Sequence, residues 1–252
     1  MPDENRTALV TNAAGYAGPP AVTALSSSGF RVVVHDKAFD DTVARAAFLQ
    51  THPGAEVILA DNPATLVAQT WKLAGRLDTI VCNDHYPAVQ ASSETVCLDE
   101  FRRTLEYLVI YPFALLQAAI PLLRSQGGGN IVLVTSCRTH APIAGGSVPD
   151  AARAAANALV RSLAIELAPD AISVNAVSPN FLYSEAYYPK AVFIDDAKGR
   201  DYVLKSVPAG RLGRPEEIGD VIRFLASTDA RFLTGALIDF NGGWPSSPIR
   251  PI

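Results

Sequence analysis

Residues 7–30, TALVTNAAGYAGPPAVTALSSSGF, combine a short apolar run, a turn of small residues and a helix-like segment. The run TALVT (7–11) is of the kind that a parallel sheet covered on both faces requires. A strand, a tight turn and a helix start form the usual entrance for a nucleotide phosphate. Tyr16 breaks that pattern, because a ring stands where phosphate binding needs bare backbone. The stretch predicts a strand–turn–helix unit and leaves its ligand open.

Further apolar runs recur at intervals that leave room for a helix between them. We predict strands at 7–11, 31–35, 56–60, 78–83, 130–136, 172–178 and 236–240. Helix-like stretches lie between them, and 99–125 and 150–168 are the clearest. This alternation implies an α/β fold, a doubly wound, Rossmann-type parallel sheet of about seven strands with helices on both faces. No linker or repeat interrupts it, so we expect a single domain over 1–252.

One connection is too long to be a turn. About 35 residues separate the strand that ends near Ser178 from the helix that starts near Pro215. Connections in compact domains are usually a few residues long, and a long one is commonly a functional lid. This one leaves the carboxyl end of a strand, where open α/β sheets bind their ligands. We therefore expect a lid over the substrate site at 179–212.

Composition and charge argue against several classes of partner. The 252 residues carry a net charge of −4 with scattered basic residues, so nothing favours nucleic acid. No apolar run approaches the roughly 18 residues that a membrane span needs. The polar start MPDENRT differs from a signal peptide. Charged residues make up only 18%, against roughly 25% in average globular proteins, which is compatible with a surface covered by partner subunits.

Cysteine and histidine usage indicates neither a disulfide framework nor a metal site. Cys82, Cys97 and Cys137 are odd in number and form no CxxC pair. The four histidines show no HxxxH or HExxH spacing. These patterns predict reduced thiols, no bound metal and a cytoplasmic location.

Motifs spread over nearly the whole chain resemble those of the short-chain dehydrogenase/reductase superfamily. They are VCN (81–83), VTS (134–136), ARAAANALVRSLAIELA (152–168), ISVNAVSP (172–179), RLGRPEEIGDVIRFLAS (211–227) and FNGGW (240–244). Within it, TNAAGYAGP (11–19), HDKAF (35–39), VCNDHYP (81–87) and SPNFLYSE (178–185) are similar to the halohydrin dehalogenases. That resemblance implies a cofactor-independent lyase, usually a homotetramer. Such enzymes close vicinal haloalcohols to epoxides with halide release, and open epoxides with small anions.

The first turn departs from the reductases' pattern T-G-x-x-x-G-x-G. Asn12 replaces the first glycine, Tyr16 replaces the second, and only Gly18 remains in register. A phenol at the second position fills the space of a dinucleotide, so no NAD(P) is expected. The resemblance places Tyr16 in a halide pocket, and an ordinary loop aromatic is the alternative. Asp36 and Asp61, at strand ends that hold adenosine in reductases, are then relics or loop caps.

The residues after the sixth predicted strand also differ from the reductases' pattern. Reductases carry Pro-Gly there, whereas this chain has Pro179 and Asn180. In the dehalogenases this stretch forms an anion nest of backbone N–H groups. The resemblance places Pro179, Asn180, Phe181 and Leu182 on the nest, with Tyr188 closing the pocket from the lid. An ordinary structured loop is the alternative.

The resemblance also implies a catalytic set. In the family, a serine and a tyrosine hold the substrate hydroxyl, the tyrosine takes its proton, and an arginine lowers the tyrosine pKa. Ser136 ends the fifth predicted strand, and Arg153 lies 17 positions later, where reductases carry lysine. A solvated helix arginine is the alternative for Arg153. Asp84 is expected to order the Ser136 region or to join a water relay, and a buried structural carboxylate is the alternative.

The tyrosine of that set is missing. It belongs four positions before Arg153, on the same helix face, and Pro149 stands there. Proline near the start of a helix costs no hydrogen bond, and Ser147 is a candidate cap. We therefore expect the helix to form and the general base to be lost. The superfamily's asparagine after the fourth strand is also absent, and its place is near Leu108.

Other groups are candidates for the lost base. Asp150 lies about 100° round the helix from Pro149 and is expected to point elsewhere. Water held by Ser136 and Arg153 is a further option. Tyrosines and histidines of the flanking loops complete the candidates, namely Tyr86, Tyr183, Tyr187, Tyr188, His85 and His140.

Three functions remain open from the sequence. The first is a halohydrin dehalogenase-like lyase, weakened by the missing tyrosine, that binds a haloalcohol or epoxide and a small anion. The second is a non-catalytic small-ligand-binding protein of the same fold. The third is an NAD(P)-dependent oxidoreductase, which Tyr16, Pro149 and Asn180 oppose.

Overall fold

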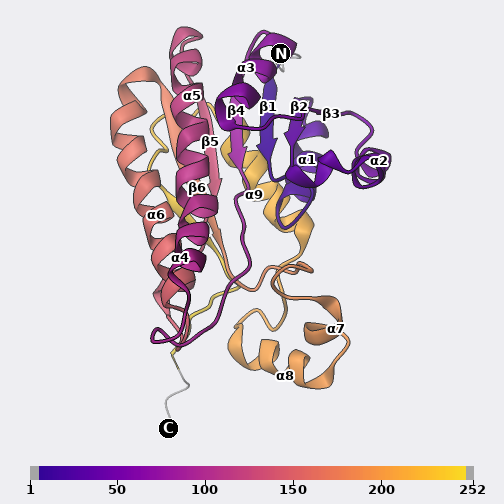
Figure 1. Cartoon of the computed structure of the whole chain (residues 1–252), viewed down its shortest axis with the longest axis vertical. Helices are drawn as coiled ribbons and strands as arrows, with labels where there is room; N and C mark the ends of the chain where they lie inside the picture. Colours follow the sequence, from indigo (N-terminus) through magenta and orange to yellow (C-terminus); the bar gives the residue numbers. More distant parts are fainter. Residues whose placement is uncertain (1–5, 248–252) are drawn as a thin grey trace.

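The computed structural model describes residues 6–247. The outer ends of the predicted 1–252 domain, including most of the MPDENRT start, lie outside these residues. A single parallel sheet runs through the molecule in the order β3-β2-β1-β4-β5-β6-β7 (Figure 1), and the predicted doubly wound α/β fold is confirmed. Its strands are β1 (Thr7–Thr11), β2 (Arg31–His35), β3 (Ala55–Val57), β4 (Thr79–Cys82), β5 (Gly129–Val134), β6 (Ile172–Pro179) and β7 (Leu237–Phe240).

Predicted and observed strands differ mainly at their ends. β3 stops at Val57, before the predicted end at 60, although the Ile58 N–H still donates to the Val34 carbonyl at 3.0 Å. β5 stops at Val134, two residues before the predicted end. Ser136 therefore lies just beyond the sheet, at the edge where the parallel strands all end.

Helices cover both faces of the sheet (Figure 1). On one face pack α1 (Gly18–Ser26), α2 (Thr42–Thr51) and α9 (Pro215–Ser227), and on the other α3 (Pro63–Ala74), α5 (Tyr111–Ser125) and α6 (Ser147–Leu167). Alternate strand residues point to opposite faces. Val10 and Val32 accordingly join the first buried core, and Leu9 and Val33 join the second. Short 3₁₀ turns occur at Lys37–Asp40, Arg138–His140 and Ala168–Asp170.

The longest helical segment is not uniform. One helix was predicted over 99–125, whereas the structure has α4 (Leu98–Leu105), a π-helical turn (Glu106–Ile110) and α5 in succession. The Tyr111 N–H bonds to the Glu106 carbonyl five residues back. Pro112 follows and has no N–H to continue an α-helical ladder. The wide turn places Leu108 in a buried position.

The same segment is also longer and more apolar than the sequence led us to expect of any part of the chain. Leu98–Ser125, with a mean hydropathy of 1.5 in its most apolar window, is long and apolar enough to cross a membrane by those two criteria alone. Glu106 and Gln117 break the apolar run in the sequence. In the structure, α5 packs Leu115 and Leu116 into the core beneath the sheet.

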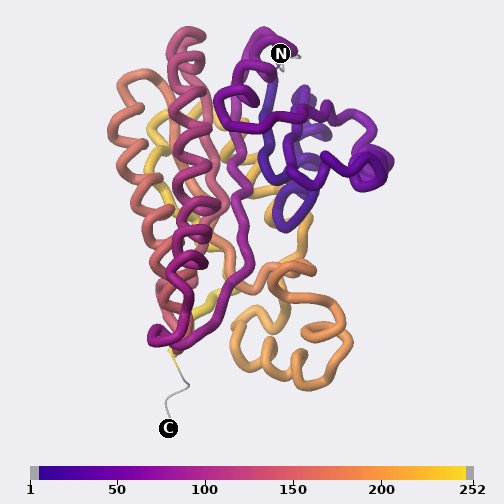
Figure 2. Tube along the Cα trace, in the orientation of Figure 1, coloured from indigo at the N-terminus to yellow at the C-terminus, as the bar shows by residue number. Residues whose placement is uncertain are grey.

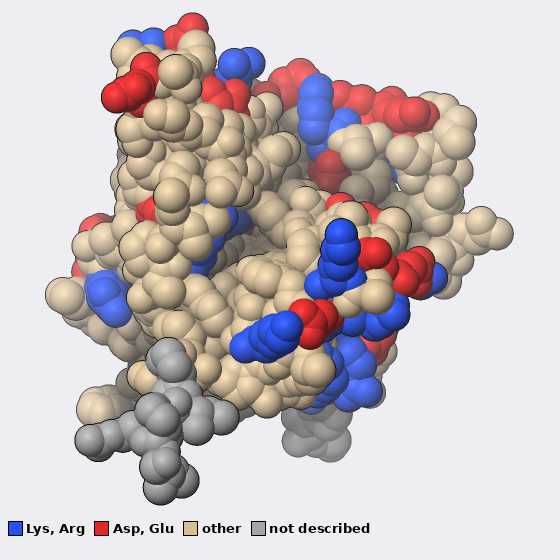
Figure 3. Space-filling model, turned by 90° about the horizontal axis from the view of Figure 1, so that it is seen from below, with Lys and Arg blue, Asp and Glu red and all other residues tan. Residues whose placement is uncertain are grey.

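Residues 180–214 form an excursion below the carboxyl edge of the sheet (Figures 1 and 2). An isolated parallel bridge joins Leu182 to Gly213 at its base. Its outer part carries α7 (Lys190–Phe193) and α8 (Ala197–Ser206). The excursion has a small apolar core of its own, formed by Phe181, Val203, Val207 and Leu212 with Trp244 packed against it. The segment that was predicted as a lid thus lies at the ligand-binding edge of the fold, on the side of the molecule that Figure 3 views from below.

Gly18, at the end of the turn after β1, has no space for a side chain. A β-carbon at this position would lie 2.6 Å from the Ala13 carbonyl oxygen, which is backbone and cannot move aside cheaply. Gly18→Ala is expected to lower the free energy of unfolding by about 1–3 kcal/mol through overpacking. Urea unfolding at neutral pH measures the change.

Gly54→Ala is the matched control, because nothing lies within 4 Å of a β-carbon built there. Its unfolding midpoint is expected to stay at the wild-type value. Equal stability of Gly18→Ala and wild type would contradict this packing of the turn.

Candidate active site

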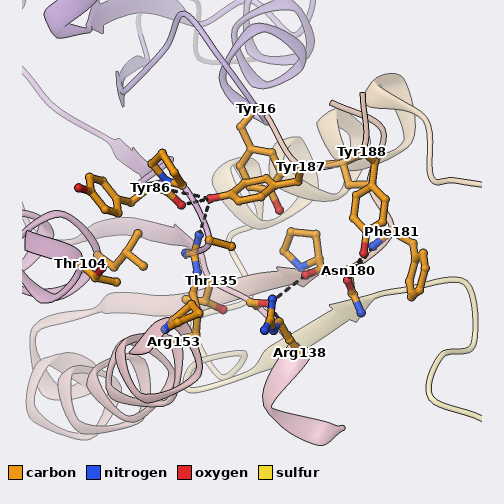
Figure 4. Close-up of a pocket in the computed structure, with 17 residues that line it drawn as sticks. Tyr16, Tyr86, Thr104, Thr135, Arg138, Arg153, Asn180, Phe181, Tyr187 and Tyr188 are labelled. Carbon is orange, nitrogen blue, oxygen red and sulfur yellow. Dashed lines mark hydrogen bonds between the residues drawn. The ribbon is translucent and has the colours of Figure 1, made fainter. Parts of the chain in front are cut away.

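A cavity of about 160 Å³ opens at the carboxyl edge of the sheet, near the point where the strand order reverses between β1 and β4. Such reversal points are where open α/β sheets bind ligands. The volume is small beside the roughly 300–1,000 Å³ of sites for drug-sized molecules. Its walls come from the β1–α1 turn, the segment after β4, α4 and the π-helical turn, the ends of β5 and β6, α6 and the lid (Figure 4). The lining residues are Tyr16, Tyr86, Pro87, Ala88, Thr104, Leu108, Thr135, Ser136, Arg138, Pro149, Arg153, Pro179, Asn180, Phe181, Leu182, Tyr187 and Tyr188.

Tyr16 forms the wall on the β1 side of the cavity (Figure 4). Its φ of 54° is left-handed, a conformation that glycine adopts freely and tyrosine rarely. Ring contacts compensate for this strain, since Tyr16 packs edge-on against Tyr187 at 5.0 Å and tilted against His85 at 5.8 Å. Removal of its hydroxyl from water raises the pKa of Tyr16. The glycine-like backbone is therefore kept while a ring fills the space above it.

Asp84 lies behind this turn rather than on the cavity wall. Its carboxylate accepts a hydrogen bond from Asn12 Nδ2 at 2.7 Å. Asn83 Nδ2 in turn donates to the carbonyls of Asn12 and Gly15 at 2.7 and 2.9 Å, which fixes the turn to the end of β4. Burial raises the pKa of Asp84 to about 7, against the opposing effects of the Arg153 charge and the Asn12 hydrogen bond. Asp84 therefore titrates near neutral pH.

Arg153 is a buried cation in the wall of the cavity. It projects from α6, is only 7% exposed, and donates from Nη1 to the carbonyls of Asp84 at 3.1 Å and Val134 at 3.3 Å. Its Nη2 donates to the Tyr187 hydroxyl at 3.4 Å (Figure 4). Guanidinium groups do not lose their charge in proteins, so the cavity contains a permanent positive charge.

Ser136 is held just beyond β5. Its hydroxyl donates to the Pro179 carbonyl at 3.3 Å and accepts from the Arg138 N–H at 3.1 Å. Asn157 Nδ2 donates to the Ser136 carbonyl at 3.0 Å, which ties this turn to α6. The hydroxyl thus lies on the cavity wall between the ends of two strands.

Pro149 is buried and lines the cavity from α6. It is the third residue of the helix, where the N–H has no intrahelical acceptor in any case. The predicted cap is wrong, because the N-cap is Gly146 and Ser147 is already helical. The Ser147 hydroxyl lies instead 3.1 Å from that of Ser93. The helix therefore tolerates Pro149, which brings no polar side chain to the cavity.

Residues 179–182 line the cavity next to Ser136. The Asn180 N–H donates to the Phe240 carbonyl at 3.0 Å, and the Phe181 N–H donates to Asn180 Oδ1 at 3.0 Å. The Tyr188 hydroxyl donates to the same Oδ1 at 2.8 Å. Phe181 has a φ of 56°, which turns this stretch sharply. Pro179 has no N–H, and within residues 6–247 the Leu182 N–H has no acceptor. It is therefore the one backbone donor of these four residues without a partner in the protein.

Comparison with known proteins places the chain in a family. A family model described as Enoyl-(Acyl carrier protein) reductase matches residues 14–245. Dehydrogenase/reductase SDR family member 4 of Homo sapiens is 30% identical over 251 residues, which cover 97% of this chain and 89% of that protein. The chain belongs to the short-chain dehydrogenase/reductase superfamily.

Two solved structures have backbones very similar to that of this chain. One, described as a dehalogenation enzyme, has a TM-score of 0.92 at 36% identity, over 97% of this chain and 100% of that chain. The other, halohydrin dehalogenase (HheC) bound to ethyl (2S)-oxiran-2-ylacetate, has a TM-score of 0.93 at 31% identity, over 97% and 99%. The chain is therefore similar both to oxidoreductases of the superfamily and to dehalogenases.

Most of the residues that the sequence singled out lie around one cavity. Of the ten residues singled out for catalysis or the halide pocket, nine line the cavity and Asp84 lies behind it. His140, which was a candidate for the lost base, lies 3.4 Å from Asp239 instead. Asp36 accepts from the Ala14 and Ala38 N–H groups at 2.9 and 2.8 Å, as a loop cap does.

Two features of the cavity were missed or left undecided. Arg138 lines it and pairs with Asp150 at 2.8 Å. Its place two residues after Ser136 was the only signal, and arginines at strand ends are common in loops. Tyr187 was one of six candidates for the base, and only the fold of the lid brings its hydroxyl to Arg153.

The raised pKa of Asp84 makes a prediction about stability. A carboxyl with a pKa of about 7 in the fold and about 4 in the unfolded chain binds its proton more tightly when folded. Its stabilisation is complete below pH 4 and is lost as pH rises through 7. Between pH 5 and pH 8, the free energy of unfolding of wild type is expected to fall by roughly 3 kcal/mol more than that of Asp84→Asn. This variant keeps an acceptor oxygen for Asn12.

Urea unfolding of both proteins at the two pH values measures this difference. The variant is the reference for wild type, because all other titrating groups are the same in both. An equal change in wild type and variant between pH 5 and pH 8 would show that Asp84 is already ionised throughout.

Proposed function

We propose that this protein is a cofactor-independent lyase that closes vicinal haloalcohols to epoxides with release of halide, and opens epoxides with small anions. The observation that carries the proposal is the cavity itself. Its lining brings together a hydroxyl, Ser136, a buried cation, Arg153, the Tyr16 ring and Leu182, whose N–H has no acceptor among the described residues. These groups suit an alcohol at one end and a departing anion at the other.

The residues at the first turn do not fit a nicotinamide dinucleotide. The rings of His85 and Tyr187 both pack against the Tyr16 ring, where a pyrophosphate would approach the turn. A β-carbon at Gly15 would lie 3.2 Å from His85 Nε2, so this turn is already closely covered by the segment after β4. A dinucleotide could enter only if these rings moved away. We therefore assign no reaction step to such a cofactor.

The proposed chemistry needs only groups of this chain. The Ser136 hydroxyl orients the substrate hydroxyl, and Arg153 stabilises negative charge that develops on the substrate oxygen. The proton of that oxygen passes to a basic group of the site. The oxygen then bonds to the carbon that carries the halogen, and the carbon–halogen bond breaks with its electron pair remaining on the halide. The Leu182 N–H, the edge of the Tyr16 ring and the enclosing lid favour the halide over bulk water at that point.

An oxidoreductase is the second candidate, because the human relative is named as a dehydrogenase/reductase. Titration of the purified protein with NADH and NADPH, followed by protein fluorescence, separates the two candidates. We expect no saturable binding at micromolar concentration, since the aromatic rings occupy the crevice. Micromolar binding of either nucleotide would overturn the lyase proposal in favour of the oxidoreductase.

Halide release from 2-bromoethanol, without added nucleotide, tests the lyase directly. We expect bromide release by wild type, and a fall in kcat of about 10²-fold or more for Ser136→Ala and for Arg153→Gln, because each removes a group that stabilises the transition state. Arg161→Gln and Ser162→Ala are matched controls on exposed positions of α6 and are expected to keep wild-type kcat.

Pro149→Tyr completes the test by placing a phenol at the position that the family uses. If neither wild type nor this variant releases halide while both remain folded, the lyase proposal fails. A bromide-dependent rise in Tm without turnover would then support a non-catalytic anion-binding protein.

A further inference from the structure

The proposed reaction requires a group that takes the proton of the substrate hydroxyl, and α6 presents only the Pro149 ring where such a group could stand. Guanidinium groups cannot accept a proton. Serine and threonine hydroxyls are weak bases when neutral, and their high pKa keeps them from ionising near neutral pH. No histidine is among the lining residues, so the side chains that could accept the proton directly are the phenols on the cavity wall and the neighbouring carboxylate.

Asp84 does not meet the geometric requirement. Its carboxylate is directed to Asn12 Nδ2, behind the first turn, and the residue is not part of the cavity wall. It faces the Arg153 side chain only electrostatically, since the guanidinium hydrogen bond goes to the Asp84 backbone carbonyl. Asp84 can adjust the charge around Arg153 but does not touch a substrate in the cavity.

Three of the four phenols on the wall are poor acceptors. Burial raises the pKa of Tyr16 and of Tyr188, and the Tyr188 hydroxyl already donates to Asn180. Burial, and then a hydrogen bond to Glu100, raise the pKa of Tyr86. The Tyr86 ring stacks on Tyr107 at 4.8 Å, away from Arg153. All three phenols are held as neutral groups.

Tyr187 is the phenol whose oxygen has donors aimed at it. Arg153 Nη2 donates to this oxygen at 3.4 Å, and the Tyr86 N–H donates to it at 3.1 Å. The Tyr187 hydroxyl itself donates a hydrogen bond to the Tyr86 carbonyl at 2.7 Å (Figure 4). No other phenol among the cavity-lining residues has a guanidinium within hydrogen-bond distance.

The lid holds this phenol in place from the other side. The Tyr187 N–H donates to Ser184 Oγ at 3.2 Å, and the Tyr188 N–H donates to the Ser184 carbonyl at 2.9 Å, which closes a tight turn. The Tyr187 ring packs edge-on against Tyr16. The hydroxyl is thus fixed by the backbone of residue 86, by α6 and by the first turn.

We infer that Tyr187 is the proton acceptor of this site, a catalytic residue supplied by the lid in place of one supplied by α6. The inference rests on the proposed lyase function. In the reacting form, Tyr187 has released its proton to solvent, and Arg153 and the Tyr86 N–H hold the phenolate oxygen. The substrate hydroxyl replaces the Tyr86 carbonyl as the hydrogen-bond partner of that oxygen. Its proton passes to Tyr187 as the epoxide oxygen–carbon bond forms and halide departs.

Tyr187→Phe tests the inference, because it removes one oxygen and keeps the ring that packs on Tyr16. We expect kcat for halide release to fall about 10²–10⁴-fold, the usual contribution of a placed base. KM is expected to stay near the wild-type value, whereas Tm is expected to fall modestly, because Arg153 and the Tyr86 N–H each lose one acceptor. Tyr183→Phe is the matched control, since the Tyr183 hydroxyl bonds to Glu185 outside the cavity.

Pro149→Tyr combined with Tyr187→Phe extends the test, and recovery of kcat in the double variant supports loss of a base as the cause. Wild-type kcat in Tyr187→Phe overturns the inference and leaves the proposed function standing. Halide release by Pro149→Tyr alone, with an inactive wild type, likewise overturns it. If neither wild type nor Pro149→Tyr releases halide, the proposed function and the inference fail together.

A second probe separates a chemical role from a structural one even if Tyr187→Phe folds poorly. Incorporation of 3,5-difluorotyrosine at position 187 leaves the ring and the hydroxyl but makes the phenol more acidic. The pH–rate profile of kcat is expected to move to lower pH, because the unprotonated fraction grows at each pH. An unmoved profile would overturn the inference, since a residue that only packs or holds the lid would leave it unchanged.

Discussion

The buried guanidinium of Arg153 is the constraint on which the rest of the site depends. A charge taken out of water is costly unless hydrogen bonds replace its hydration. Arg153 obtains them from the carbonyl of Asp84 after β4, the carbonyl of Val134 at the end of β5, and the Tyr187 hydroxyl on the lid. One side chain of α6 therefore joins two strand ends to the lid, and the cavity is the space that these elements enclose.

The first turn adapts to that enclosure without changing the backbone path. Asn12 and Tyr16 keep left-handed φ angles of 48° and 54°. Strain of this kind persists where surrounding contacts hold it, and it gathers at functional sites. Here Asn12 is held by Asp84, and Tyr16 is held by the rings of His85 and Tyr187. The ligand-binding edge of a dinucleotide fold has thereby become the wall of a small cavity.

The sheet was predictable from local patterns, because each parallel strand needs a short run that is apolar on both faces. Ser136 and Arg153 were singled out by the resemblance to a known family, which has a serine at this strand end and an arginine 17 positions later. Tyr16 stands where the superfamily's motif has a glycine. Arg138 and Tyr187 did not follow in the same way. Their places depend on how the loops after β5 and β6 fold over the sheet, and loop geometry leaves no periodicity in the sequence. The π-helical turn was not predicted for a similar reason. It changes which backbone carbonyl each N–H bonds to, but it leaves the pattern of apolar and polar residues unchanged.

The central claim is that this edge of the sheet receives a small anion beside Tyr16 in place of a dinucleotide phosphate. A crystal structure of the protein soaked in bromide, with the ion located by its anomalous scattering, tests it most directly. The account predicts a bromide peak inside the cavity, within hydrogen-bond distance of the Leu182 N–H and against the Tyr16 ring. A cavity without bromide, together with nucleotide density at residues 12–18 when NADH is added, would contradict it.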